Sequence, residues 1–159
     1  MDHRCPGCGL PLPQGVPAWV RHLTVGQAMT RELVTLGPED SLMRAVEVMR
    51  LKRIRRIPVL LGGQLIGLLG EGDLKRAEPS TLSESEADFN RVMEETPISR
   101  IMIKDPVTVE EDALLAEALV TMVTHKFGTL PVLRGGVLVG ILTDSDLLRC
   151  LADLLRHGG

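Results

Sequence analysis

The second half of this sequence repeats the first half. Shifted by 73 positions, residues 25–76 align with residues 98–149 without a gap, and 17 of the 52 aligned residues are identical. The identities include Met29 and Met102, Pro58-Val59-Leu60 and Pro131-Val132-Leu133, Gly67 and Gly140, and Asp73 and Asp146. A repeat of fixed period is one supersecondary unit that cannot bury its apolar face alone. We therefore expect two units packed about a pseudo-twofold axis, with a groove between them.

The size and composition of the repeats support this pairing. The chain has 159 residues, and a unit of about 52 residues has only a marginal core of its own. The chain is 44% hydrophobic, yet Trp19, Phe89 and Phe127 are its only aromatic residues. The core is therefore expected to consist of Leu, Val, Ile, Ala and Met, and a bound base would lie between aliphatic side chains.

The charge and hydropathy patterns exclude several classes of protein. The formal net charge of −3 gives no general attraction to nucleic acid, so no nucleic-acid partner is expected. The longest uncharged apolar run, residues 57–70, is too short to span a bilayer. The N-terminus has no signal-peptide pattern, and three cysteines do not form a disulfide framework. We expect a soluble, cytoplasmic protein without a membrane partner.

Apolar periodicity and turn residues predict the same order of elements in both repeats. In the first repeat these are a strand at 33–36, a helix starting after 38–41, strands at 57–61 and 64–69 around Gly62-Gly63, and a helix from 70–73. In the second repeat they are a strand at 107–109, a helix over 115–122, strands at 130–133 and 137–142, and a helix over 144–155. The predicted fold is α+β, with two β-α-β-β-α units.

This reading divides the chain into four parts. They are an N-terminal extension with a Cys-x-x-Cys motif (1–23), repeat 1 (24–76), an acidic connector (77–97) and repeat 2 (98–155). Within the connector, residues 84–95 are predicted to form a short helix with Ala87, Val92 and Met93 facing inward.

The repeated unit resembles a known family. The hydrophobic-Pro-Val steps at 57–59 and 130–132, and the Gly-x-x-Thr-x-x-Asp segment at 140–146, are similar to those of a tandem pair of CBS domains, the Bateman module. The resemblance covers about residues 24–155. The connector at 74–80 is similar to stand-alone CBS proteins of the acetoin-utilisation type.

The resemblance implies a regulatory module that binds an adenine nucleotide in the cleft between the repeats. AMP, ADP and ATP are the expected ligands, with S-adenosylmethionine and NAD as related possibilities. It also implies a homodimer in the form of a flat disc of four repeats. In such modules the Asp of the Thr-x-x-Asp step holds the ribose, the first strand lies against the adenine, and residues before the hydrophobic-Pro-Val step meet the phosphates.

Carried onto this sequence, the resemblance favours one binding site over the other. Repeat 2 has both Thr143 and Asp146, whereas Gly70 replaces the Thr in repeat 1 and leaves only Asp73. A carboxylate can accept both vicinal ribose hydroxyls, and a Thr hydroxyl and helix N-terminal amides suit a phosphate. We expect one competent site at Asp146 and a weak or empty site at Asp73. The alternative is that Asp146 only caps its helix.

The remaining predicted contacts surround the same site. Arg55 and Arg56 stand directly before Ile57-Pro58 and are expected to meet the phosphates across the cleft, whereas their counterparts are Gly128 and Thr129. Thr129 and Thr108 are included as candidate nucleotide contacts, Thr108 through the strand that faces the adenine. The competing interpretations are a solvated, dipole-stabilised helix end for the arginines and an ordinary strand residue for Thr108.

The N-terminal extension contains a separate candidate site. Cys5-Pro6-Gly7-Cys8 has the spacing of a zinc knuckle, with two thiolates that a glycine-containing turn aims at one ion. Four ligands are required, and the rest would come from His3, His22, Cys150 or a second chain. A redox pair and a tail with free thiols are the alternatives.

The sequence therefore supports two functional hypotheses. The first is a nucleotide-sensing module that acts in trans on an unidentified partner protein. The second is a dimerisation scaffold without sensing, whose zinc knuckle docks a partner. No enzymatic activity is expected, because the four histidines are scattered and no nucleophile, Walker loop or paired carboxylates form a recognisable set.

Overall fold

The computed structural model describes residues 4–5, 7–10, 17–79 and 85–157. The elements of the first half are η1 (Ala18–His22), α1 (Val25–Ala28), α2 (Leu42–Lys52), β1 (Arg56–Leu61), β2 (Gln64–Gly70), α3 (Glu71–Ala77) and α4 (Glu86–Glu95). Those of the second half are η2 (Ile98–Arg100), β3 (Ile103–Lys104), β4 (Val109–Glu110), α5 (Leu115–His125), β5 (Thr129–Arg134), β6 (Val137–Thr143) and α6 (Asp144–His157). The predicted α+β class is confirmed.

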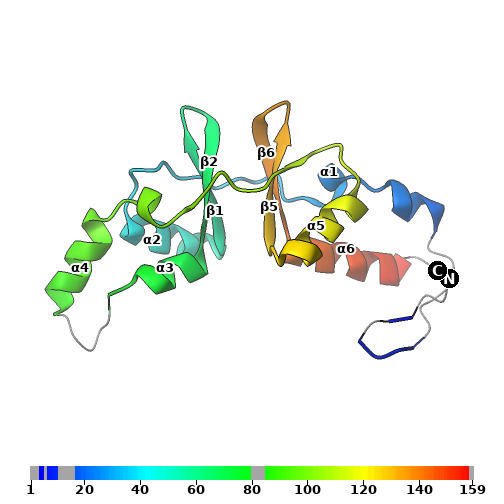
Figure 1. Cartoon of the computed structure of the whole chain (residues 1–159), viewed down its shortest axis with the longest axis horizontal. Coiled ribbons are helices and arrows are strands. Elements are labelled where there is room, and N and C mark those ends of the chain that lie inside the picture. The colour runs from blue at the N-terminus through cyan, green and yellow to red at the C-terminus, as the bar shows by residue number, and fades with distance from the viewer. Residues whose placement is uncertain (1–3, 6, 11–16, 80–84, 158–159) are drawn as a thin grey trace.

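Two matching β-hairpins form the centre of the molecule. Figure 1 shows β1–β2 beside β5–β6, with α2, α3 and α4 on one side and α1, α5 and α6 on the other. Each hairpin turns through two glycines with positive φ, 57° and 79° at Gly62-Gly63 and 56° and 82° at Gly135-Gly136. Positive φ at both central residues is what a tight type I′ turn requires, so the predicted glycine turns are confirmed. Each hairpin also has a register shift at the same place, after Val59 and after Val132.

The segment that leads into each repeat pairs with the hairpin of the other repeat, an arrangement called here the exchange of leading segments. Strand β3, which leads into repeat 2, pairs antiparallel with β2 of repeat 1 through Ile103 and Leu68. The matching contact is an antiparallel bridge between Thr30, which leads into repeat 1, and Ile141 of β6. Each hairpin is thus paired at its outer strand with chain from the other half of the sequence.

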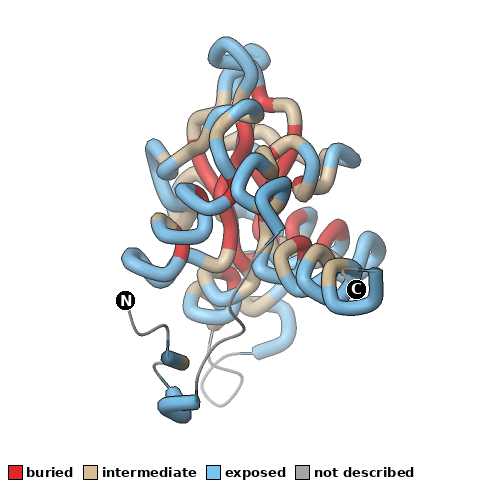
Figure 2. The backbone as a smooth tube through the Cα atoms, turned by 90° about the vertical axis from the view of Figure 1, so that its right-hand side faces the viewer, coloured by how far each residue is buried: buried red, intermediate tan, exposed pale blue. Residues whose placement is uncertain are grey.

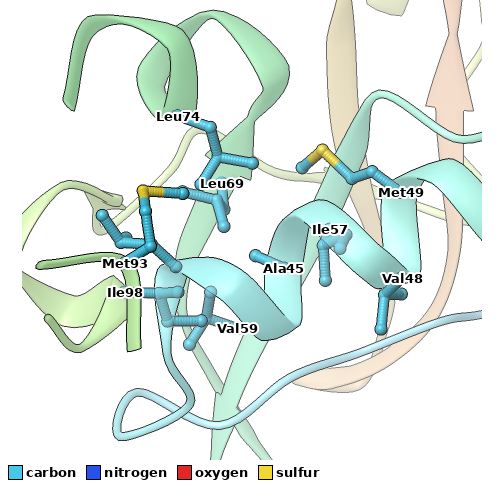
Figure 3. Close-up of a cluster of buried hydrophobic side chains, with 10 residues drawn as sticks. Ala45, Val48, Met49, Ile57, Val59, Leu69, Leu74, Met93 and Ile98 are labelled. Atoms are coloured by element: carbon cyan, nitrogen blue, oxygen red, sulfur yellow. The ribbon is translucent and has the colours of Figure 1, made fainter. Parts of the chain in front are cut away.

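The hydrophobic cores show the same exchange. The core of repeat 1 contains Met93 and Ile98 from the chain between the repeats, packed with Ala45, Ile57 and Leu69 (Figure 3). The core of repeat 2 is composed of Val25 and Met29 from the N-terminal side together with Ala118, Leu115, Met122, Leu130, Val132 and Leu142. Figure 2 shows the buried residues concentrated along the hairpin strands and the helix faces turned toward them. The packed units therefore differ from the sequence repeats in their boundaries.

A pair of methionine–glycine contacts fixes the exchange. Met29 lies against Gly140, where an added Cβ would be 2.6 Å from the Met29 sulfur and 2.9 Å from the Thr30 carbonyl oxygen. Met102 lies against Gly67 in the same way. Real Cβ atoms do not approach other atoms so closely, so a larger residue at either position would force the methionine or the neighbouring backbone to shift. This contact explains why both the methionine and the glycine are identical in the two repeats.

Replacing Gly140 with alanine is expected to lower the free energy of unfolding by about 1–3 kcal/mol, because the added methyl overpacks the Met29 contact. Gly72 provides the matched control, since it is exposed within α3 and an added Cβ would meet only the flexible Arg76 side chain at 3.4 Å. Gly72→Ala is expected to be neutral or stabilising by up to about 1 kcal/mol. Urea unfolding of the three proteins measures both effects, and equal stability of wild type and Gly140→Ala would contradict the prediction.

An ion-pair cluster fastens the N-terminal segment onto repeat 2. Glu111 pairs with both Arg134 and Arg31, at 2.7 Å for Arg31, and Gly26 N–H donates to the Glu111 carbonyl at 2.9 Å. These contacts hold the pKa of Glu111 below its usual value, through hydrogen bonds from Arg134 first and Arg31 second.

Two details differ from the sequence prediction. The expected strand at 33–36 is reduced to a single parallel bridge between Leu36 and Val59, because residues 31–35 cross from one sheet to the other. The expected strand at 107–109 is displaced to Val109–Glu110, where it pairs in parallel with β5.

The connector helix lies where the sequence predicts it, and Met93 is buried as predicted, but the prediction that Ala87 faces inward is wrong. In α4, Met93 is buried and Phe89 packs on the core of repeat 1, whereas Ala87 is exposed. Phe89, Val92 and Met93 lie at i, i+3 and i+4 on one helical face, and Ala87 falls outside that face. Among the described residues, no helix is both long enough and apolar enough to cross a membrane.

Candidate functional site

A cleft of about 570 Å³ lies between the two repeats. Its first wall is the crossing segment from Thr30 to Val34, its second is the chain from Arg53 to Arg56, and its third is the junction of β6 and α6. Five residues predicted from the sequence line this cleft together: Arg55, Arg56, Thr129, Thr143 and Asp146. The cleft thus joins the basic segment of repeat 1 to the Thr-x-x-Asp segment of repeat 2.

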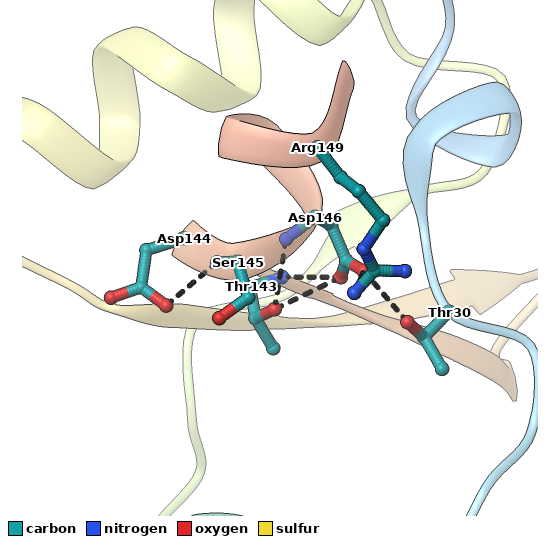
Figure 4. A network of polar contacts seen from close by, with 6 residues as sticks. All are labelled: Thr30, Thr143, Asp144, Ser145, Asp146 and Arg149. Atoms are coloured by element: carbon teal, nitrogen blue, oxygen red, sulfur yellow. Dashed lines mark hydrogen bonds and ion pairs between the residues drawn. The ribbon is translucent and has the colours of Figure 1, made fainter. Parts of the chain in front are cut away.

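Asp146 is the most constrained polar residue of the cleft. It is only 3% exposed, in the first turn of α6. One carboxylate oxygen accepts the backbone N–H of Thr143 at 2.9 Å and its hydroxyl at 3.1 Å. The Thr143 hydroxyl also accepts the Asp146 N–H at 3.3 Å, which completes a reciprocal cap at the start of the helix (Figure 4). The predicted capping role of Asp146 is therefore present in the structure.

The other oxygen of Asp146 faces two residues that sequence reasoning missed. The Thr30 hydroxyl donates to it at 2.7 Å, and the Arg149 guanidinium lies 3.5 Å away (Figure 4). Both Thr30 and Arg149 line the cleft. Arg149 could have been predicted from the repeat, because Arg76 occupies the same position in repeat 1 and pairs with Asp73. No sequence pattern points to Thr30, since it reaches Asp146 only because the leading segment of repeat 1 lies against repeat 2.

The charges of the cleft are mixed but arranged in zones. Its lining contains four arginines and three acids among the described residues: Arg53, Arg55, Arg56 and Arg149, with Glu32, Asp144 and Asp146. Three of the arginines come from one short stretch at the end of α2 and the start of β1, so positive charge gathers on the repeat 1 side. An anionic group would be attracted to that side and repelled by Asp144.

Arg56 lies at the junction of the two repeats. Its guanidinium donates to the Arg55 carbonyl at 2.9 Å. A Cβ placed on Gly70 would be 3.3 Å from the Arg56 guanidinium, and one placed on Gly128 would be 3.9 Å from it. Arg56 therefore fills the space beside Gly70, the position that corresponds to Thr143.

The equivalent place in repeat 1 is organised differently. Asp73 accepts the Gly70 N–H at 2.9 Å and pairs with Arg76, but it does not line the cleft. A Cβ at Gly70 would lie 2.9 Å from the Asp73 carboxylate, so a threonine does not fit there without rearrangement. Together with Arg56, this leaves repeat 1 without a counterpart of the Thr143–Asp146 arrangement.

Thr108 also lies outside the lining of the cleft. The crossing segment beside Asp146 comes from repeat 1, so Leu33 and Val34 hold the position that had been predicted for a strand of repeat 2. This placement does not test the predicted role of Thr108 as a nucleotide contact, which stays a prediction.

The two N-terminal cysteines form a short turn. Gly9 N–H donates to the Cys5 carbonyl and Cys5 N–H to the Leu10 carbonyl, both at 2.8 Å, and Gly9 has φ of 71°. The backbone N–H groups of Cys8 and Gly7, and then the Cys8 side chain, lower the pKa of the Cys5 thiol. His3, a predicted further ligand, lies outside the described residues. No group of three or more His, Cys, Asp or Glu able to hold a metal occurs among the described residues.

Comparison with known proteins agrees with this architecture. The CBS domain model matches the chain twice, at residues 25–80 and 98–153. A CBS domain-containing protein of Dictyostelium discoideum is 34% identical over 135 residues, which cover 83% of this chain and 93% of that protein. The chain spans 43% of the length of a 33.4 kDa protein of Thermofilum pendens, to which it is 33% identical.

Solved structures show the same fold. A structure from Vibrio cholerae, described as an acetoin utilization protein (AcuB), is 34% identical with a TM-score of 0.70, over 84% of this chain and 93% of that chain. The structure of CBSX2 in complex with AMP is 26% identical with a TM-score of 0.70, over 82% of this chain and 97% of that chain. This chain therefore belongs to the CBS-domain family and contains two CBS domains in tandem.

Proposed function

We propose that this protein is a regulatory module that binds one adenine nucleotide per chain in the cleft at Asp146. The observation that carries the proposal is the cleft itself, in which Arg55 and Arg56 of repeat 1 face Thr143 and Asp146 of repeat 2. The AMP complex of CBSX2, a relative with the same fold, makes AMP the first ligand to test.

The ribose would be held by Asp146. A carboxylate offers about four lone-pair sites, two on each oxygen; Thr143 fills both on one oxygen and Thr30 one on the other. One ribose hydroxyl would therefore take the free site, and the second would replace the Thr143 hydroxyl. The two vicinal hydroxyls of the ribose would donate charge-assisted hydrogen bonds to these carboxylate oxygens, in a site screened from water. Thr30 and Arg149 would then act as positioning residues, because they fix the direction of the carboxylate.

The base and the phosphate would occupy opposite zones of the cleft. Leu33, Val34, Ile54, Pro58 and Ile141 supply apolar surface for the adenine. The phosphate would lie at Arg53, Arg55 and Arg56, where three cations gather. A ligand in this position contacts both repeats, so it would favour arrangements in which the repeats are held together and thereby signal to a partner protein.

A thermal-shift and calorimetric screen with AMP, ADP, ATP, S-adenosylmethionine and NAD tests the proposal. Ligand at about 100 times its dissociation constant should stabilise the protein by about 2.7 kcal/mol, which raises the Tm by about 5–10 °C. Binding of one molecule per chain supports the proposal. Absence of any shift with all five ligands rejects it, and turnover of ATP by the pure protein would reject a purely regulatory role.

The second candidate function is a dimerisation scaffold without sensing. The exposed faces of the helices differ between the repeats, being more apolar in repeat 2, and this favours an interface on repeat 2. Val120 and Val123 of α5 are 65% and 77% exposed, whereas the corresponding residues of α2 are the charged Glu47 and Arg50. On α6 the exposed apolar residues are Leu148, Leu151 and Leu155. We propose that a second copy covers this face of repeat 2, in either functional role, and the supporting observation is that these leucines lie on one helical face.

Leu155→Glu is expected to weaken self-association by at least about tenfold, because a charge would be buried in this apolar face. Leu155 is 78% exposed, so the monomer should fold normally. Leu51→Glu is the matched control, since Leu51 is 71% exposed on repeat 1. Sedimentation equilibrium measures the association, and equal weakening by both substitutions would contradict an interface on repeat 2.

A further inference from the structure

Asp144 places a negative charge on the side of the cleft where the arginines gather. It is the first residue of α6, it is exposed, and it lines the cleft together with Arg56 and Gly128. One of its carboxylate oxygens accepts the Ser145 N–H at 2.8 Å, which fixes the direction of the side chain (Figure 4). Its own backbone N–H donates to the Gly128 carbonyl at 3.1 Å. The carboxylate is therefore held beside the chain that leads into β5.

Gly128 locates this carboxylate relative to the arginines. A Cβ placed on Gly128 would be 3.8 Å from the other carboxylate oxygen of Asp144 and 3.9 Å from a guanidinium nitrogen of Arg56. The two opposite charges thus flank the same point of the cleft, and glycine has no side chain to fill the space there. An anionic group that binds Arg56 at this point would also meet Asp144, and repulsion between like charges would oppose it.

The two acids at the start of α6 face different parts of the cleft. Asp146 accepts hydrogen bonds from Thr30 and Thr143, whereas the free oxygen of Asp144 lies on the Gly128 side. A nucleotide with its ribose at Asp146 and its first phosphate at the arginines would approach Asp144 with each further phosphate. The carboxylate of Asp144 thus limits how much negative charge this end of the cleft accepts.

We propose that Asp144 makes the cleft selective for a nucleoside monophosphate over the diphosphate and the triphosphate. This inference rests on the proposed nucleotide binding at Asp146 and specifies its ligand class. The described lining carries four arginines against three acids, a small net positive charge. One phosphate group brings about two negative charges, and each additional phosphate adds charge that this lining does not balance.

Repeat 1 has no such device in this cleft. Glu71 is the residue that corresponds to Asp144, and it stands first in α3. Its carboxylate pairs with Lys75 at 3.4 Å, and it does not line the cleft. Glu71 therefore provides a matched control, an acid at the same position of the repeat without access to the proposed phosphate site.

Isothermal titration calorimetry of the full-length protein with AMP, ADP and ATP, first without divalent cations and then with magnesium, tests the proposal. The expected affinities fall in the order AMP, ADP, ATP. Asp144→Asn should raise the affinity for ATP relative to that for AMP by at least about fivefold, because like charges brought together in a binding site are costly. Asparagine keeps an oxygen for the Ser145 N–H, so the free variant should show the Tm of the wild type within a few degrees. Glu71→Gln should leave the ratio of the two affinities unchanged.

The outcomes separate this selectivity from nucleotide binding itself. A wild type that binds none of the three nucleotides would reject the binding function, and the selectivity with it. Binding of AMP, with ATP bound as tightly as AMP or with a ratio that Asp144→Asn does not change, would reject the selectivity alone. Tight ATP binding that requires magnesium and is lost in Asp144→Asn would also reject it, because Asp144 would then hold a metal ion on the phosphates.

Discussion

Asp146→Asn is expected to weaken adenine-nucleotide binding by about 10- to 100-fold. The substitution keeps the size of the side chain and one oxygen that can accept the Thr143 N–H, but it removes the negative charge. A hydrogen bond to a charged group contributes about 1.5–3 kcal/mol, and each 1.4 kcal/mol corresponds to tenfold in affinity. Isothermal titration calorimetry with AMP, and with any other ligand that the screen identifies, measures the loss.

The same substitution in repeat 1 is the control. Asp73 occupies the equivalent position, caps its helix through the Gly70 N–H and pairs with Arg76. It does not line the cleft, so Asp73→Asn should leave the affinity and the stoichiometry of one per chain unchanged. Equal losses in the two variants, or two sites in the wild type, would contradict a single site at Asp146.

Stability must be measured alongside affinity, because Asp146 also caps α6. Asparagine keeps an oxygen for the Thr143 N–H, and the lost partner Arg149 is 70% exposed, so its guanidinium remains solvated. The asparagine variant should therefore remain folded. Arg55→Gln tests the binding site independently of the α6 cap, since Arg55 is exposed and lines the cleft. It should weaken binding of AMP without changing the Tm of the free protein.

Much of the candidate site could be predicted from the sequence, because aligned positions of the two repeats carry different residues at the site. The differences between Thr143 and Gly70, and between Arg55 and Gly128, are enough to favour one cleft over the other from the sequence alone. The structure then brought Arg55, Arg56, Thr129, Thr143 and Asp146 to the same cleft. Their role as nucleotide contacts stays a prediction until binding is measured.

What could not be predicted depends on contacts between the halves. Thr30 donates to Asp146 across 116 positions of sequence, and no local pattern announces such a contact. Thr108 lies outside the lining of this cleft because the wall beside Asp146 is built by the crossing segment of repeat 1. Periodicity indicates which face of an element is apolar, but it does not say which partner covers that face.

The exchange of leading segments predicts which fragment of this protein can fold. Residues 31–104 contain the whole buried core of repeat 1, including Met93 and Ile98 from the chain between the repeats. Residues 24–76, the repeat as the sequence defines it, lack both and instead carry Val25, which packs in the other core. We expect fragment 31–104 to unfold cooperatively in urea and fragment 24–76 to show no cooperative transition.

The size of the expected difference follows from the missing core residues. Met93 is 2% exposed and Ile98 is completely buried. Truncating one such side chain to alanine costs about 2–5 kcal/mol, so losing both, with the partly buried Phe89, would exceed the stability of a small unit. Fragment 7–80 has the same length as 31–104 but carries the wrong leading segment, so it controls for chain length. Circular dichroism and urea titration compare the three fragments. Cooperative folding of 24–76 or 7–80 without folding of 31–104 would show that each repeat completes its own core and would contradict the exchange.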